Sequence, residues 1–377
     1  MELRLSEVLK EIEGNKFFKL LKEGNLVKVS YRFNSPKVFD SPIKRELRGI
    51  TFDAVSGKVL SRPFHKFFNL NEHPETEERK LSDRRFVFRE KFDGTMLHPV
   101  LVGGEVRFLS QKAFRNPQVE KGEELLRRSG KLYESVKKLL EKGYTPIFEL
   151  ISPQFQLVIP YEEELLLLTE VRRNRDGRYV MEENTEELEE MGFVLPPVFS
   201  GTLEEAEAVV SDREGIEGFV GKEAVWREPF PLFFKLKSPW YHDRHYAFTY
   251  LHNIPDHKLF NLFLRGEADD IFQRVTNREL REDKRKRLSL LTELYGELLS
   301  LVDSLAPLYG KRGFEEALRR GILELKERFS GKFRSLDINE NYLKEACRIR
   351  RRGGNYEKFL GEKLYIQLKH GEVSLAP

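Results

Sequence analysis

The sequence predicts an α+β fold in which a domain built on antiparallel sheets is followed by an all-helical C-terminal domain. Up to about residue 245, short apolar segments alternate with polar residues and are separated by turn residues, such as Gly103-Gly104. Beyond that point the apolar residues recur at helical spacing. Because 377 residues exceed what one hydrophobic core usually fills, we expect two domains, 1–245 and 246–377.

The N-terminal elements follow from changes of period. Apolar residues between Leu5 and Leu21 recur at helical spacing with a break at Gly14, which predicts two short helices. One long amphipathic helix is predicted over 119–142. Alternating segments predict strands over 27–31, 47–52, 59–68, 86–95, 97–102, 105–110, 146–150, 156–161, 165–171, 218–222 and 232–237, and short helices are expected over 183–191 and 203–210.

The C-terminal third is amphipathic throughout. Helices are predicted over 256–265, 268–280 and 314–329, and an apolar stripe runs from Leu288 to Leu305. We expect the linker between the domains near residues 241–255.

The composition is that of a soluble globular protein with a densely charged surface. Hydrophobic residues make up 40% and charged residues 34%, but the net charge is only +3, so any attraction to nucleic acid must come from local basic patches. The single cysteine, Cys347, excludes an internal disulfide and indicates a reducing, cytoplasmic (intracellular) setting. Neither a signal peptide nor a membrane span is expected. The abundance of Lys, Arg and Glu is typical of a thermophilic protein.

A lysine stands at the end of one predicted strand, in the stretch REKFDGT over residues 89–95. Lys91 can be held there in a pocket while its amine faces a ligand, and Gly94 supplies the turn. The alternative is a surface lysine beside Asp93 in an ordinary hairpin, which this stretch alone does not exclude.

Two acids and two further lysines also lie within predicted strands. An unpaired buried charge is strongly penalised, so Glu149 and Glu217 are either ion-paired at a sheet rim or functional. Lys235 and Lys237 are two residues apart on one strand, so their amines point to the same face. Two cations that converge on one position are suited to bind an anion such as phosphate. The alternative is a basic strand face exposed to solvent.

In this order along the chain, these stretches resemble the nucleotidyltransferase motifs shared by DNA ligases, RNA ligases and mRNA capping enzymes. The motif stretches are 89–94, 148–150, 217–220 and 235–237. Four further stretches are similar to the ATP-dependent RNA ligases of the phage tRNA-repair type, the RNA ligase family 1 branch: 47–52, 62–69, 171–177 and 235–241. The resemblance covers roughly residues 27–246 and implies a nucleotidyltransferase fold, that of an ATP-grasp-like ligase.

The resemblance implies a reaction in three steps. Lys91 attacks the α-phosphate of ATP and carries AMP, the AMP passes to an RNA 5′-phosphate, and an RNA 3′-hydroxyl then expels it. Lys235, Lys237 and Arg48 are the implied catalytic residues at the phosphates. Because only the free amine can attack, we expect nearby cations to lower the pKa of Lys91.

The implied ATP site is larger than this catalytic set. By the resemblance, Phe68 stacks on adenine, Glu149 binds the ribose hydroxyls, Asp93 binds the ribose or a metal-bound water, and Glu217 holds Mg²⁺ or Mn²⁺. The remaining implied ATP-binding residues are Lys66, Glu90, Gly94, Lys112, Arg172, Lys235 and Lys237. Ala113, after Lys112, stands where a glycine is expected.

The implied partner is RNA with 5′-phosphate and 3′-hydroxyl ends, either single-stranded or a nicked tRNA loop. Arg350 and Arg351 are predicted to contact RNA phosphates, although a charge run on a helix is often only a solvated face. Two other functions stay open. A capping-type guanylyltransferase or a DNA ligase would normally carry a β-barrel after Lys237, where helices are predicted here, and a nucleotide-sensing RNA-binding protein would lack turnover.

Histidines offer no recognised metal pattern. The spacing of His65, His98, His242 and His245 fits no zinc motif, so surface or hydrogen-bonding roles are expected.

Overall fold

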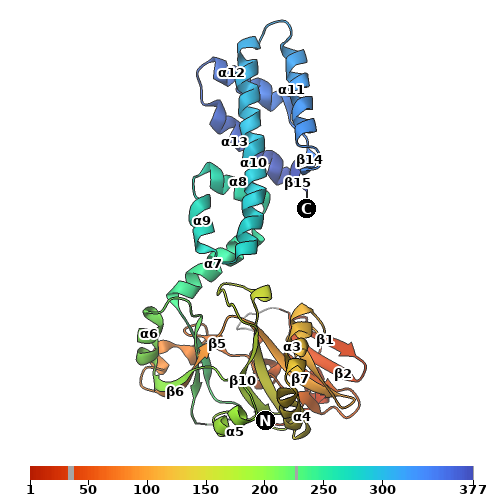
Figure 1. The fold of residues 1–377 in the computed structure, drawn as a ribbon, viewed down its shortest axis with the longest axis vertical. Helices are drawn as coiled ribbons and strands as arrows, with labels where there is room; N and C mark the ends of the chain where they lie inside the picture. The colour runs from red at the N-terminus through yellow and green to blue at the C-terminus, as the bar shows by residue number, and fades with distance from the viewer. Residues whose placement is uncertain (33–37, 226–227, 377) are drawn as a thin grey trace. The chain divides into compact units, whose positions relative to one another are not determined.

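The computed structural model describes residues 1–32, 38–225 and 228–376 (Figure 1). The chain divides into two compact units, Met1–Asp243 and Arg244–Pro377. The first unit holds three sheets and the second is mainly helical, in agreement with the predicted α+β class. No helix in the described ranges is long and apolar enough to cross a membrane.

The described residues of the first unit form two four-stranded sheets and one five-stranded sheet. The first sheet has the order β1 (Phe18–Glu23), β2 (Leu26–Tyr31), β3 (Arg48–Asp53), β4 (Val59–Ser61). The second has the order β10 (Leu165–Arg173), β9 (Tyr144–Ile151), β7 (Thr95–Val102), β8 (Glu105–Ser110). The five-stranded sheet has the order β11 (Val198–Thr202), β6 (Arg85–Lys91), β12 (Gly218–Glu223), β13 (Phe233–Lys237), β5 (Phe68–Asn69), and only its β13–β5 pair is parallel.

Helices cover the outer faces of two of these sheets. The helices of this unit are α1 (Leu5–Glu11), α2 (Pro42–Glu46), α3 (Pro117–Arg128), α4 (Gly130–Glu141), α5 (Thr185–Glu190) and α6 (Leu203–Ser211). α3 and α4 pack on the β7–β10 sheet through a core that includes Leu126, Val136 and Phe148. α6 packs on the five-stranded sheet, where Ala206 and Phe234 share a second core. The opposite face of the β7–β10 sheet packs in part on the first sheet, where Leu26 and Val100 share a core, and residues at its other end line the site described below.

Several predicted elements were wrong in ways that local geometry explains. Residues 18–23 form strand β1 instead of a helix, because Gly24, at a φ of 55°, closes a hairpin onto β2. The single helix predicted over 119–142 is two helices. Ser129 between them has an extended backbone, and its side chain caps α4 by accepting a hydrogen bond from the backbone N–H of Leu132.

Two predicted strands are shorter or absent. The strand expected over 59–68 is reduced to β4 and β5, with irregular chain between them. The strand expected over 156–161 does not form. The backbone N–H groups of Val158 and Ile159 instead donate to the carboxylate of Asp93, at 2.8 and 2.9 Å. A side chain thus takes the donors that a strand partner would have used.

The second unit is helical, as predicted, except for one short pair of strands. Its helices are α8 (Asp256–Leu264), α9 (Ala268–Arg274), α10 (Arg278–Leu305), α11 (Phe314–Arg328), α12 (Glu340–Arg351) and α13 (Tyr356–His370), and β14 (Phe333–Leu336) pairs with β15 (Val373–Leu375). The stripe of α10 packs against α11, α12 and α13. The expected linker near 241–255 is instead largely helix α7 (Pro239–Asn253), and the predicted helix 268–280 breaks where Asn277 caps α10.

Two histidines, His65 and His98, are buried in the first unit, and we expect them to make the stability of the fold depend on pH. Burial lowers the pKa of His65 and of His98, and nearby cations, Arg172 for His65 and Lys28 for His98, lower both further. Below pH about 6.5 the unfolded chain therefore binds more protons than the folded chain, so stability falls as the pH is lowered. We expect the free energy of unfolding to fall by up to about 1.4 kcal/mol per pH unit for each histidine.

Urea denaturation between pH 6.5 and 5 measures this slope. In a His98→Gln variant one of the two titrating groups is absent. The dependence of the free energy of unfolding on pH should therefore become shallower by up to about 1.4 kcal/mol per pH unit. An equal slope in the variant and the natural protein would contradict the assignment.

Candidate active site

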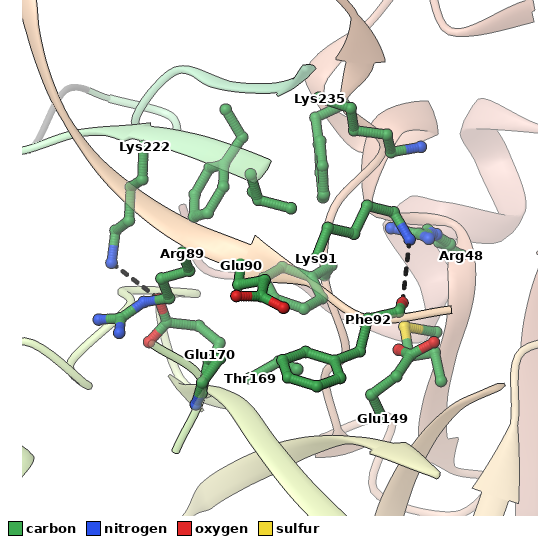
Figure 2. Close-up of a pocket in the computed structure, with 16 residues that line it drawn as sticks. Arg48, Arg89, Glu90, Lys91, Phe92, Glu149, Thr169, Glu170, Lys222 and Lys235 are labelled. Atoms are coloured by element: carbon green, nitrogen blue, oxygen red, sulfur yellow. Dashed lines mark hydrogen bonds and ion pairs between the residues drawn. The ribbon is translucent and has the colours of Figure 1, made fainter. Parts of the chain in front are cut away.

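A pocket lies between the five-stranded sheet and the β7–β10 sheet of the first unit (Figure 2). Residues on strands of both sheets contribute to its walls, together with Arg48 at the start of β3 and the irregular segment after β4. The lining residues are Arg48, Phe64, Phe67, Arg89, Glu90, Lys91, Phe92, Met96, Glu149, Thr169, Glu170, Pro196, Val220, Lys222, Phe233 and Lys235.

Strand register brings the predicted lysines onto one wall. Lys91 at the end of β6 pairs with Gly218 of β12, and Gly218 pairs with Lys237 of β13. Arg89 and Lys235 lie in the next row, both opposite the same residue of β12. Residues two apart on a strand share a face, so these four cationic side chains project from one face of the sheet. Gly218 leaves the space between Lys91 and Lys237 free of a side chain.

Lys91 is held by an acid from the neighbouring strand segment. Its Nζ donates to Oε2 of Glu217 at 2.8 Å and lies 3.5 Å from the carbonyl oxygen of Phe92. Burial lowers the pKa of Lys91, but the carboxylates of Glu217 and Glu149 outweigh it, and the pKa is raised above its ordinary value. In this structure acids and not cations are the nearest charged partners of the amine, and the lowered pKa that attack requires stays a prediction for the site with ATP and a metal ion bound.

Glu217 is shared between two lysines. Its Oε1 lies 3.3 Å from Nζ of Lys237, while Oε2 accepts from Lys91, and its side chain is only 4% exposed. Its position immediately before β12 places the carboxylate at the Lys91 end of the pocket. The acid predicted within a strand is thus ion-paired and lies beside the nucleophile candidate.

Unpaired cations gather near Lys91. Burial and then the charge of Arg48 lower the pKa of Lys66 to about 8. Burial lowers the pKa of Lys235 well below its usual range, and the charges of Arg48 and Lys66 add to this. Two guanidinium nitrogens of Arg48, Nε and Nη1, are buried and have no hydrogen-bond partner among the described residues. Arg48, Lys66 and Lys235 form no ion pair among the described residues, and such a group of cations is suited to bind a multiply charged anion.

Glu149 and Gly94 mark a close approach of two strands. The backbone N–H of Gly94 donates to Oε1 of Glu149 at 3.2 Å, and burial raises the pKa of Glu149 to about 7. A Cβ atom at position 94 would lie 2.3 Å from the carbonyl oxygen of Leu150. The turn after Lys91 can therefore pack on β9 only if residue 94 is glycine.

A Gly94→Ala variant should be less stable than the natural protein by roughly 2 kcal/mol, because the added methyl overlaps the backbone of β9. Denaturant unfolding measures the loss. Gly130→Ala is the matched control, since a Cβ at residue 130, the first of α4, meets nothing within 4 Å. A loss of the same size in both variants would contradict the close-approach argument.

The structure separates the predicted catalytic and ATP-binding residues into two groups. Those that line the pocket are Arg48, Glu90, Lys91, Glu149 and Lys235. Glu217, Lys237 and Lys66 adjoin it through the contacts given above. The predicted stacking residue, Phe68, is fully buried and does not line the pocket. Its ring stacks on that of His73, with the ring centroids 4.3 Å apart. Its neighbour Phe67 lines the pocket instead.

Asp93 and Arg172 make structural contacts instead of facing the pocket. Oδ1 of Asp93 accepts from the hydroxyl of Tyr241 at 2.7 Å, and Oδ2 accepts the two backbone bonds of the 158–159 segment. Arg172 is fully buried and donates to both oxygens of Glu46, at 2.6 and 2.7 Å. We therefore assign both residues to support of the pocket in this structure, and not to direct contact with a nucleotide.

Lys112 lies outside the pocket, on the turn that follows β8. That turn is pinned by Lys28, which is fully buried and whose Nζ donates to the carbonyl oxygens of Ser110 and Ala113 at 2.8 and 2.5 Å. Ala113, in place of the expected glycine, is accommodated in this turn. A ligand role of Lys112 remains a prediction.

Three charged residues of the pocket were missed by sequence reasoning. Arg89, Glu170 and Lys222 line its other end and are linked by ion pairs. Arg89 and Lys222 could have been found from strand alternation, since each lies on the pocket face of its strand. Glu170 could not, because a bulge between Leu168 and Glu170 shifts the register of β10 and no local signal marks it.

Comparisons with known proteins show the family to which the chain belongs. The model of a family described as RNA ligase matches residues 46–241. The chain is 58% identical, over the whole length of both proteins, to a putative RNA ligase of Thermovibrio ammonificans. It is 29% identical to RNA ligase 1 of bacteriophage TS2126, over 79% of this chain and 72% of that protein. A solved archaeal ATP-dependent RNA ligase aligns with a TM-score of 0.48 and 17% identity, over 93% of this chain and 96% of that one.

Proposed function

The chain belongs to the RNA ligase family. We propose that it is an ATP-dependent RNA ligase, which joins RNA ends through an AMP carried on Lys91. The observation that supports this most is the position of Lys91 between two kinds of charge. Acids hold its amine on one side, and the cations Arg48 and Lys235 line the same pocket without acidic partners among the described residues. A nucleophile and an anion site thus share one pocket.

The first step forms a bond from Nζ of Lys91 to the α-phosphorus of ATP and breaks the bond from that phosphorus to the bridging oxygen. Pyrophosphate leaves, and the amine loses a proton. Arg48, Lys66 and Lys235 bind the triphosphate and stabilise the charge that develops on the leaving group. The ion pair between Lys91 and Glu217 must break first, since only a neutral amine is nucleophilic.

The next two steps use RNA. An oxygen of the 5′-phosphate attacks the lysine-bound AMP and displaces Lys91, and the 3′-hydroxyl then attacks the activated 5′-phosphate and expels AMP. Positioning and charge neutralisation carry most of the catalysis in such transfers. We propose 5′-phosphate and 3′-hydroxyl ends, on single-stranded RNA or a nicked tRNA loop, as the substrate.

A divalent metal ion, Mg²⁺ or Mn²⁺, fits the acids at this end of the pocket. Mg²⁺ is commonly bound by one or two carboxylates together with substrate phosphates. Glu217 and Glu149 offer that donor set, and no grouping of three or more His, Cys, Asp or Glu ligands occurs in the described parts of the chain. When bound, the metal ion supplies neutralisation of the phosphate charge.

We propose that the second unit contributes to RNA binding. Arg350 and Arg351 are exposed, although Nε of Arg350 pairs with Asp303 at 2.8 Å and Arg351 donates to the carbonyl oxygen of Tyr309 at 2.6 Å. Replacing both arginines by alanine should weaken RNA binding about tenfold, mostly at low salt, because two phosphate contacts are lost.

Filter binding of a 5′-phosphorylated RNA at several salt concentrations tests this prediction. The variant Arg319→Ala/Arg320→Ala on α11 is the matched control, since both residues are exposed. Equal affinity of the two double variants for RNA at low salt would show that Arg350 and Arg351 do not contribute to RNA binding. AMP transfer to the protein should be unchanged in both.

The joining reaction itself is tested with a 5′-labelled single-stranded oligonucleotide in RNA and in DNA form. We expect circular or joined RNA only when ATP and a divalent metal ion are present, with AMP and pyrophosphate as products. A capping-type guanylyltransferase would instead use GTP, and a DNA ligase would prefer the DNA strand. Binding of RNA and ATP without any joining would support the non-catalytic alternative.

A further inference from the structure

The pocket has a second charged end, remote from the phosphate-binding cations. Figure 2 shows Lys222, Arg89 and Glu170 gathered on one side, while Lys235, Arg48 and Glu149 lie on the other. Figure 2 shows the carboxylate of Glu90 between the two ends, and the remaining walls of the pocket are mostly apolar and aromatic, with Phe64, Phe67, Phe92, Met96, Val220 and Phe233. A pocket that combines aromatic and apolar walls with a few polar groups is suited to an aromatic base.

Buried ion pairs hold the groups at this end in place. Nζ of Lys222 lies 2.8 Å from Oε2 of Glu170 and also pairs with Glu182, which accepts from Nη2 of Arg89 at 2.9 Å. The side chains of Lys222 and Arg89 are about one-tenth exposed and that of Glu170 is 1% exposed. Charges desolvated to this extent are fixed in direction, as a recognition site requires.

One donor at this end has no partner. Nε of Arg89 is buried and makes no hydrogen bond to any residue that the structure describes. Leaving a buried donor of a charged group unsatisfied is costly, and the cost is removed when a ligand acceptor reaches it. Arg89 lies two residues before Lys91 on the same face of β6, roughly 7 Å along the strand, which is within the reach of one nucleotide from phosphate to base.

Glu170 supplies an acceptor beside this donor. Its Oε1 accepts from the backbone N–H groups of Val171 and Met181, at 3.0 and 3.1 Å, and its Oε2 from Lys222. Burial raises the pKa of Glu170 above its ordinary value, although the charge of Lys222 opposes that shift, and three donors converge on the carboxyl group. A carboxylate can accept about four hydrogen bonds, so one acceptor position is left.

We propose that Arg89 and Glu170 select the base of the nucleotide, an inference that rests on the proposed use of this pocket by ATP. Nε of Arg89 donates to a ring nitrogen of adenine, and the carboxylate of Glu170 accepts from the 6-amino group. Guanine has an oxygen acceptor at position 6 where adenine has a donor, so the carboxylate would repel it. The pair therefore both attracts adenine and rejects guanine.

Equilibrium binding of ATP and GTP, measured by titration calorimetry, tests this assignment independently of turnover. The titrations use the full chain with Lys91→Met, which cannot form the covalent adduct. Arg89→Lys keeps the charge that pairs with Glu182 but removes the Nε donor, and Glu170→Gln removes the negative charge. Arg84→Lys is the matched control. Arg84 directly precedes β6 and pairs with Glu223, but it does not line the pocket.

With the Lys91→Met background, ATP should bind at least about 100-fold more tightly than GTP. Arg89→Lys should weaken ATP binding by about tenfold or more, and Glu170→Gln should reduce the preference for ATP over GTP by at least about tenfold. Arg84→Lys should change neither. Unchanged ATP affinity in Arg89→Lys together with an unchanged preference in Glu170→Gln would overturn the inference, whereas failure of the natural protein to take up AMP would count against the proposed function alone.

Discussion

Replacement of Lys91 by methionine is expected to abolish transfer of AMP from ATP to the protein, with a loss of more than about 1000-fold. The amine of Lys91 pairs with Glu217, and the same carboxylate also pairs with the neighbouring Lys237. No other group in the described pocket combines a nucleophilic atom with this position. The transfer is measured with ATP labelled at the α-phosphate, followed by denaturing electrophoresis.

The control for this variant is Lys138→Met, which removes an exposed lysine of α4 on the far side of the β7–β10 sheet. It should take up label like the natural protein. Persistent labelling of Lys91→Met would show that the nucleophile lies elsewhere.

The second large effect is expected at Lys235. A Lys235→Met variant should transfer AMP about 100-fold more slowly, because a cation that stabilises the departing pyrophosphate is removed. The variant should be at least as stable as the natural protein. Lys235 has no acidic partner among the described residues, and the positive charges of Arg48 and Lys66 destabilise its charged form.

Both quantities come from the same protein sample, as a rate of labelling and a melting temperature. Activity lost together with several degrees of melting temperature would indicate a structural role for Lys235 instead. The reverse reaction, release of label by pyrophosphate after loading, should be slowed to a similar degree.

Strand patterns were sufficient to predict most of the first unit and the centre of its site. Alternation located the strands that carry Lys91, Glu149 and Lys235, and the two-residue spacing of Lys235 and Lys237 predicted that they share a face, as the register confirms. The order of these motifs along the chain predicted the family, which the comparisons confirm.

The remaining features depend on tertiary contacts that alternation does not encode. Asp93 lies in the predicted motif, but its carboxylate is used by the backbone of residues 158–159, which leaves that segment without a strand. Glu170 faces the pocket only because of a bulge. The choice between Phe67 and Phe68 depends on how the chain enters β5, and two adjacent aromatic residues carry no signal of which one faces inward.

The position of the covalent AMP tests the account most directly. The protein is incubated with ATP and Mg²⁺, digested, and analysed by mass spectrometry for a peptide that carries AMP. We predict a single adduct, on Lys91, that disappears when pyrophosphate is added. An adduct on another residue such as Lys235, or a protein that joins RNA without any adduct, would contradict the assignment of Lys91 as the nucleophile.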